Sequence, residues 1–159
     1  IYGGGDSKLG QTAGAPKAKA SKKGKEIRSK IMSDLDGFAD LSKAIQERAQ
    51  SGVLNGLDGR PIRLQGKNHA ALNYLLQSAG AVICKQWLLR SYELLDEAGI
   101  DYWPLAFVHD EVQLSVAPEH VEQAEFLITA AMKDVEHAVK FRCALDSESQ
   151  HGRNWADCH

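Results

Sequence analysis

Two adjacent carboxylates, Asp110 and Glu111, stand directly after His109 in an apolar part of the sequence. Carboxylate oxygens are hard ligands that suit Mg²⁺, and sites for this ion commonly combine one or two carboxylates with substrate phosphates. A divalent cation held in this way can stabilise both the attacking and the leaving oxygen of a phosphoryl transfer. The pair therefore indicates a candidate site for metal-dependent phosphoryl transfer. Spacing alone fits a solvent-exposed acidic turn without chemistry even better, and both interpretations stay open at this point.

A β-hairpin is expected to position this pair. The apolar run Leu105–Val108 precedes it, and Val112, Leu114 and Val116 alternate with polar residues after it. Alternation with a period of two is typical of a strand with one buried face, and the few residues between the two runs leave room only for a tight turn. The sequence therefore predicts two antiparallel strands with the His-Asp-Glu triplet at their tip.

The segment after this hairpin is expected to add a helix and a strand. Pro118 suits the first turn of a helix because its missing N–H is not needed there, and the helix is predicted to reach about Val139. A last strand is predicted over Phe141–Leu145, and residues 146–159 are expected to form an irregular tail.

A long helix is predicted ahead of the hairpin, from about Asn68 to Ala98. Its apolar residues recur every three or four positions, and Gly99 follows as a C-cap. At ~1.5 Å per residue it would be roughly 45 Å long. The Asp58-Gly59 turn signal, followed by Ile62 and Leu64, predicts a small hairpin before this helix.

The first fifty residues are expected to be helical. Asp6 or Ser7 is placed to cap a short helix that ends near Ala13, a Lys- and Ala-rich amphipathic helix is predicted over 16–32, and another over 36–50.

Composition limits the class of protein. The chain has 159 residues, 43% of them hydrophobic and 25% charged, as is typical of a globular protein and not of a disordered chain. No apolar run approaches the ~18 residues of a membrane span, and three widely spaced cysteines favour a reducing compartment. The net charge of −2 combines +6 over residues 1–30 and +2 over residues 31–90 with −10 over residues 91–159. The chain opens on Ile1, and we interpret it as a piece of a longer protein.

Four separated segments carry a resemblance to one family. Phe107-Val108-His109-Asp110-Glu111-Val112 resembles motif C of the family A (DNA polymerase I type) DNA polymerases, and in particular the replicative polymerases of short-tailed lytic phages. One further segment begins at Tyr2-Gly3-Gly4-Gly5, and another runs from Gly56-Leu57-Asp58-Gly59-Arg60 into His69-Ala70-Ala71-Leu72-Asn73. The fourth is the carboxyl-terminal stretch from Phe141 to His159, which resembles the end of the family's chains.

The resemblance implies roles at the hairpin. Asp110 matches the aspartate that ligates the two catalytic Mg²⁺ ions, and Glu111 matches its acidic neighbour near the metals. His109 matches the residue beside the primer terminus. The implied reaction is two-metal transfer of a nucleotide from a dNTP to a primer 3′-OH.

The resemblance also implies DNA contacts. Asn73 and Gln77, one helical turn apart, match positions that contact the primer–template duplex, where amides can pair with minor-groove acceptors common to all base pairs. Arg60 lies in the family's Leu-Asp-Gly-Arg turn and is expected near DNA. His69 stands where many members have an arginine, so the sequence departs from the family there.

The implied fold is α+β: a helical remnant of the fingers over residues 1–66, then a connecting helix and the carboxyl-terminal part of the palm over 67–159, with an antiparallel β-hairpin, a helix and a strand. Motif A and the triphosphate-binding residues of motif B lie upstream in this family. An amino-terminal segment, either a separate chain or a part cut away, is therefore an expected partner, and the isolated chain is expected to be inactive. A phage origin would place it in the host cytoplasm. The alternative is a non-catalytic DNA-binding or assembly fragment with a vestigial acidic turn.

Overall fold

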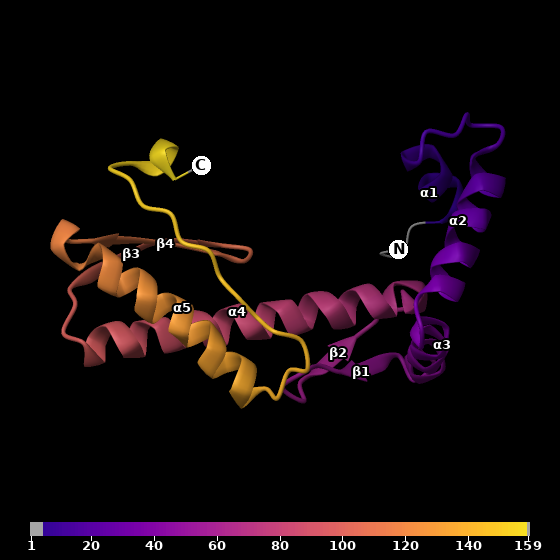
Figure 1. Ribbon diagram of the computed structural model, residues 1–159. Helices are drawn as coiled ribbons and strands as arrows, with labels where there is room; N and C mark the ends of the chain where they lie inside the picture. The colour runs from indigo at the N-terminus through magenta and orange to yellow at the C-terminus, as the bar shows by residue number, and fades with distance from the viewer. Residues whose placement is uncertain (1–4, 159) are drawn as a thin grey trace. The chain divides into compact units, whose positions relative to one another are not determined.

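The computed structural model describes residues 5–158, which form two compact units that meet within one helix. One unit ends at Ala79 and the other begins at Gly80, and each is described here by itself. Among the described residues there are five α-helices and two antiparallel β-hairpins, in an α+β arrangement (Figure 1). The predicted fold class is confirmed at this level. The division into fingers and palm at residue 66 stays a prediction, and the Gly-rich opening as far as Gly4 lies outside the described residues.

The amino-terminal unit begins with two helices that pack unusually closely. Helix α1 spans Asp6–Thr12 and α2 spans Ala20–Asp34, and they lie side by side in Figure 1. A Cβ at Gly10 would come within 1.8 Å of the Ala20 carbonyl oxygen, so only glycine fits this contact. Arg28 Nε donates to Asp6 Oδ1 at 2.7 Å and ties the second helix to the start of the first. Helix α1 is capped by Gly5, and neither Asp6 nor Ser7 acts as its N-cap, contrary to the prediction.

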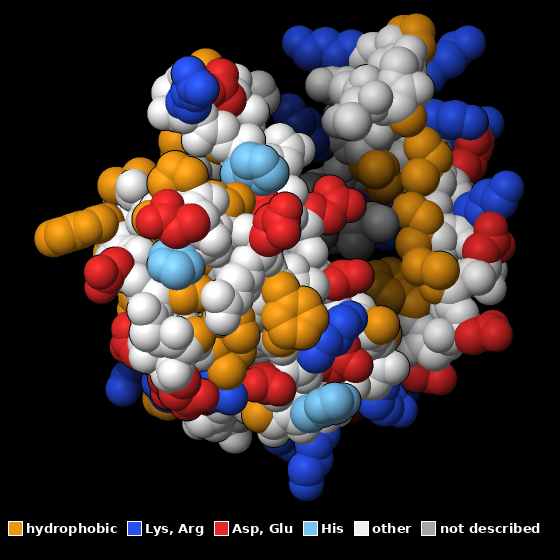
Figure 2. Space-filling view, turned by 60° about the vertical axis from the view of Figure 1, so that its left-hand side comes forward, with side chains coloured by type: hydrophobic (Ala, Val, Ile, Leu, Met, Phe, Trp, Pro, Cys, Tyr) orange, Lys and Arg blue, Asp and Glu red, His pale blue; other side chains and the backbone are white. Residues whose placement is uncertain are grey.

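Helix α2 presents lysines to solvent, as the amphipathic pattern predicts. It buries only Ala20 and Gly24. Its lysines are all exposed, and Lys23 lies 3.9 Å from Glu26. Figure 2 shows Lys and Arg side chains that project separately from the surface and do not merge into one continuous area. The helix begins at Ala20, four residues after the predicted start at Pro16.

Helix α3 (Phe38–Ala49) packs with the first hairpin, whose strands are β1 (Val53–Asn55) and β2 (Pro61–Arg63). The two strands are antiparallel, as predicted. Gly59, at φ +80°, occupies the turn between them. The core of this unit is formed by apolar residues of the helix, the hairpin and the start of the long helix: Ile45, Ala49, Leu54, Leu64 and Ala71, with Ile62, Leu72, Tyr74 and Leu75 packed around them.

The long helix α4 spans Ala71–Glu97 and follows a single 3₁₀ turn at Asn68–Ala70. Its end is defined by two backbone hydrogen bonds, from Gly99 N to Asp96 O at 3.0 Å and from Ile100 N to Leu95 O at 3.0 Å. This pair of bonds is the Schellman arrangement, with Gly99 at φ +68° as the left-handed residue. Leu95 and Ile100 are both buried in one cluster and add the apolar contact typical of this motif. The predicted helix and its glycine cap are confirmed.

The carboxyl-terminal unit places a hairpin and one helix against the later turns of α4. Strands β3 (Tyr102–Val108) and β4 (Glu111–Val116) pair antiparallel, and α5 (Val121–Ala138) follows a 3₁₀ turn at Pro118–His120. Apolar residues of α4, α5 and β4 share two core clusters: Ile83, Trp87, Leu94, Leu95, Val112, Leu114, Val116, Ala124, Ile128, Ala131, Met132 and Val135. The hairpin therefore has one face fixed against a helical layer.

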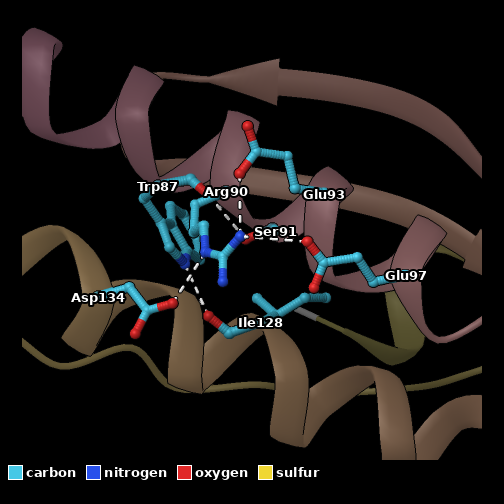
Figure 3. A network of polar contacts seen from close by, with 7 residues as sticks. All are labelled: Trp87, Arg90, Ser91, Glu93, Glu97, Ile128 and Asp134. Carbon is cyan, nitrogen blue, oxygen red and sulfur yellow. Dashed lines mark hydrogen bonds and ion pairs between the residues drawn. The ribbon is translucent and has the colours of Figure 1, made fainter.

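Polar contacts reinforce the crossing of α4 and α5. Trp87 Nε1 of α4 donates to the Ile128 carbonyl oxygen of α5 at 2.8 Å, and within α4 Ser91 Oγ donates to Trp87 O at 2.8 Å. Arg90 lies between Asp134, at 2.8 Å, and Glu93, at 3.0 Å (Figure 3). These carboxylates raise the pKa of Arg90 further above its already high value, so the guanidinium stays charged throughout. The acidic residues of this unit thus include several that serve the packing of its helices.

The predicted strand over Phe141–Leu145 is wrong. Within residues 5–158, β3 and β4 pair with each other and neither pairs with this segment. The backbone of Leu145 bonds to α5 side chains: its N–H donates to Glu136 Oε2 at 2.6 Å and its carbonyl accepts from Lys133 Nζ. A strand needs a hydrogen-bonded neighbour, and alternation of apolar residues does not provide one. Up to Cys158, the following tail has no regular structure except a 3₁₀ turn at Trp155–Asp157.

Candidate functional site

The acidic pair lies at the tip of the second hairpin, as the sequence predicts. Val108 pairs with Glu111, so His109 and Asp110 form a two-residue turn. His109 has φ +57°, a left-handed conformation that is uncommon outside glycine. Both turn residues are exposed, whereas Glu111 is half-buried as the first residue of β4. The turn therefore presents the Asp110 carboxylate to solvent on a short connection between two paired strands.

The two faces of this hairpin differ in character. Val112, Leu114 and Val116 contact the helical core. Glu111, Gln113 and Ser115 alternate with them and so lie on the outer face. The cross-strand register shifts between Pro104 and Ala106, which leaves Leu105 as an extra residue in β3. Such a bulge is common next to functional sites because it redirects a strand.

Several large apolar side chains of this unit are exposed. Trp103 is 74% exposed and Leu105 is 67% exposed on β3, and Phe126 on α5 is 71% exposed. Figure 2 shows hydrophobic side chains among carboxylates on the face that it presents. The hairpin is thus packed on one side only.

Gln113 contacts the acidic pair directly. Its Nε2 donates a hydrogen bond to Glu111 Oε1 at 2.5 Å. The family resemblance did not point to Gln113. The strand pattern could have done so, because residues i and i+2 of a strand share a face. The period-two pattern already placed Glu111 and Gln113 on the side opposite the valines.

Helix α4 lies close to the tip of the hairpin. The pKa of the Cys84 thiol is raised, first by burial and then by the negative charge of Asp110. Ile83, next to Cys84 in α4, shares a core cluster with Val112 at the start of β4. This part of α4, about one turn after the start of the carboxyl-terminal unit, therefore packs near the tip. The raised pKa keeps the thiol protonated at neutral pH, which makes it a poor nucleophile.

The donor set at the turn suits Mg²⁺ but is incomplete. Asp110 and Glu111 supply carboxylate oxygens, the ligand type that Mg²⁺ prefers. Within residues 5–158, no three His, Cys, Asp or Glu side chains come together closely enough to hold a metal ion. Asp110 can therefore serve as one protein ligand, and a complete site needs further oxygens from elsewhere.

The other three predicted site residues lie in the amino-terminal unit. Arg60 is exposed and forms an ion pair with Asp58 across the first hairpin turn. A hydrogen bond from Arg60 lowers the pKa of the Asp58 carboxyl below its ordinary value. The guanidinium is therefore held at the turn that carries it.

Asn73 and Gln77 occupy one side of α4, one turn apart, as predicted. Gln77 is exposed and Asn73 is half-buried. Asn73 Oδ1 is buried and has no hydrogen-bond partner among the described residues, and the same holds for Ser42 Oγ. Asn73 and Ser42 line a pocket of about 170 Å³ in this unit, together with Leu9, Arg28, Ile31, Met32, Phe38, Gln46, His69 and Leu72. The structure thus brings Asn73 and Gln77 together in one unit, and His109, Asp110 and Glu111 together in the other.

Comparison with known families decides the identity of the fold. The model of DNA polymerase family A matches residues 1–157. The chain belongs to DNA polymerase family A. The predicted family membership is confirmed.

Phage enzymes are similar over the whole of this family A chain. It is 38% identical to the DNA-directed DNA polymerase of Escherichia phage T7 and 35% identical to that of Enterobacteria phage T3. Both alignments cover all of this chain and 25% of the phage protein. The chain therefore spans about a quarter of the length of the curated relatives it matches.

A solved structure shares the fold. The POL domain of Pol1 from M. smegmatis, in complex with DNA primer-template and dNTP, matches with a TM-score of 0.71 at 21% identity. The match covers 84% of this chain and 25% of that one.

None of the helices within residues 5–158 has the length and hydrophobicity needed to cross a membrane.

Proposed function

We propose that this chain is the carboxyl-terminal segment of a template-directed DNA polymerase that adds nucleotides from dNTPs to a primer 3′-OH. The observation that carries the proposal is the exposed Asp110 carboxylate at the tip of a packed hairpin. This hairpin belongs to a chain whose whole length aligns with part of a phage DNA-directed DNA polymerase at 38% identity.

Asp110 and Glu111 carry the proposed chemistry. Asp110 would hold Mg²⁺ through its carboxylate oxygens, and Glu111 would add negative charge beside it. Bound Mg²⁺ stabilises charge on the attacking and leaving oxygens of a phosphoryl transfer. The packing of Val112 and Leu114 on the helical core fixes the strand that presents both groups. His109, exposed in the same turn, would contact the primer terminus.

Gln77, Asn73 and Arg60 carry the proposed DNA contacts. The exposed Gln77 amide can donate to minor-groove acceptors that are common to all base pairs, which suits a polymerase that accepts any sequence. Asn73 offers a buried carbonyl oxygen without a partner, so a ligand donor at this point would satisfy it. Arg60 would contact backbone phosphate, in exchange for its ion pair with Asp58.

An amino-terminal segment is part of the proposal. The relatives extend well beyond the region matched by this chain, and the donor set at Asp110 needs further oxygen ligands. That segment would provide the second metal-binding aspartate and the groups that bind the triphosphate. The isolated chain is therefore expected not to polymerise.

Primer extension tests the proposal. The chain alone should add no dNTP to a primed template, and the polymerase that contains it should extend the primer in the presence of Mg²⁺. Extension by the isolated chain would contradict the required second segment. In the complete polymerase, Asp110→Asn should abolish synthesis; unchanged synthesis would support instead a non-catalytic DNA-binding or assembly fragment.

A further inference from the structure

The Gln113 side chain is a polar group on the outer face of the hairpin that contacts Glu111 and has no role in the proposed function. Its amide Nε2 donates to Glu111 Oε1 at 2.5 Å, and both residues are half-buried. A hydrogen bond from an amide to a carboxylate is charge-assisted, and bonds of this kind are shorter and stronger than those between neutral groups. The contact therefore restricts where the Glu111 carboxylate can point.

The strand register favours this contact. Gln113 and Glu111 lie two residues apart on β4, opposite Ala106 and Val108 of β3. Ala106 contributes only a methyl group, and Val108 has no polar side-chain atom. Neither cross-strand neighbour can therefore compete with Gln113 for a hydrogen bond to Glu111.

We propose that Gln113 is a positioning residue of the polymerase site, which holds the Glu111 carboxylate in place beside Asp110. This inference rests on the proposed function. Adjacent carboxylates repel each other, so a Glu111 side chain that has lost the Gln113 contact is more easily displaced by Asp110. The hydrogen bond opposes that displacement and holds the Glu111 carboxylate on the outer face of β4.

The choice of an amide has an electrostatic consequence. A lysine at position 113 could also donate a hydrogen bond to Glu111, but its positive charge would cancel part of the negative potential that attracts a divalent cation. Glutamine orients the carboxylate and leaves the charge of the pair unchanged. Groups that hydrogen-bond to a metal-binding carboxylate without contacting the metal typically contribute about 10–100-fold to metal affinity.

The test uses the complete polymerase that contains this chain, bound to primer–template DNA. The dissociation constant of Mn²⁺ is measured by electron paramagnetic resonance, and kcat for dNTP incorporation is measured separately. Gln113→Leu, which lacks the donor, should weaken Mn²⁺ binding about tenfold and lower kcat without changing KM for DNA. Gln113→Lys should weaken Mn²⁺ binding at least as much although it keeps a donor. Gln123→Leu, an exposed glutamine of α5, is the matched control and should leave both values unchanged.

A double-mutant cycle distinguishes positioning from a structural role. If Gln113 acts through Glu111, adding Gln113→Leu to Glu111→Gln should cause no further loss of Mn²⁺ affinity. Additive losses, or wild-type Mn²⁺ affinity in Gln113→Leu, would overturn the proposal. Should Gln113→Leu fail to fold, as judged by its Tm, Gln113→Met keeps the unbranched shape and replaces it in the cycle. Asp110→Asn tests the proposed function independently, because its effect on synthesis does not depend on the Gln113 contact.

Discussion

Gly24 of α2 lies directly against the backbone of Asp6 in α1, where a Cβ would come within 1.8 Å of the Asp6 carbonyl oxygen. No side-chain movement can relieve such an overlap, because the obstacle is backbone. Gly24→Ala should therefore push the two helices apart and lower the free energy of unfolding by about 1–3 kcal/mol, as overpacking does. Urea-induced unfolding followed by circular dichroism measures the change.

Gly80 provides the matched control for that substitution. It lies inside α4, and a Cβ there would meet no atom within 4 Å. Gly80→Ala should raise the free energy of unfolding by about 0.5–1 kcal/mol because alanine restricts the unfolded chain and favours the helix. Equal effects of the two substitutions would contradict the close contact between α1 and α2.

Trp87 fixes the crossing of α4 and α5. It is 6% exposed, and its indole N–H donates to the Ile128 carbonyl. Trp87→Phe removes this bond and leaves a cavity, so the free energy of unfolding should fall by about 1–3 kcal/mol. Trp103→Phe, at a 74% exposed position of the same unit, should change it by less than about 0.5 kcal/mol. A larger loss at Trp103 would show that the exposed face of β3 is covered in solution.

Asn73 should separate stability from DNA binding. Its Oδ1 is buried without a hydrogen-bond partner, which is unfavourable in the free protein. Asn73→Leu should therefore leave the chain as stable or raise its free energy of unfolding by up to about 1 kcal/mol. The same substitution should weaken primer–template binding by the complete polymerase, measured by fluorescence anisotropy. Loss of stability together with unchanged DNA affinity would assign Asn73 a purely structural role.

The Asp58–Arg60 contact makes a prediction about pH. The hydrogen bond from Arg60 lowers the pKa of Asp58 below its ordinary value of 3.8 in the folded hairpin. A carboxyl with a lowered folded-state pKa stabilises the fold above its unfolded pKa, and this contribution is lost as the pH falls through the folded pKa. In an NMR titration, Asp58 should titrate below 3.8 in the native chain and move back toward that value in Arg60→Leu. An unchanged titration in the variant would contradict the contact.

Patterns that depend on near neighbours in the sequence predicted most of the fold. The alternating apolar residues on either side of the His-Asp-Glu triplet predicted that Asp110 lies in a turn, and Gly99 predicted the end of the long helix. Turns and helix ends are both set by local backbone preferences. The strand predicted over Phe141–Leu145 depends on a distant partner, and α5 side chains bond to the Leu145 backbone instead. The close approach at Gly24 likewise depends on Asp6 of α1, eighteen residues away, and no local signal marks it.

The candidate site was predicted in the same uneven way. The resemblance to family A pointed to Asp110 and Glu111 because it rests on the order of residue types along the chain. It did not name Gln113, whose contact with Glu111 depends on the rotamers of two side chains on one face of β4. Nor did it show that Asn73 Oδ1 is buried without a partner, since that depends on how α4 packs within its unit.

The rate of single-nucleotide incorporation by Asp110→Asn in the complete polymerase tests the central claim most directly. Asparagine keeps the size of the side chain and removes its charge, so the proposed role predicts a loss on the order of a thousandfold, or about 4 kcal/mol of transition-state stabilisation. Asp101→Asn, an exposed aspartate before β3, is the matched control and should retain the wild-type rate. A rate within a few-fold of wild type for Asp110→Asn, in a variant that folds and binds primer–template normally, would contradict the assignment of Asp110 as a metal-binding catalytic residue.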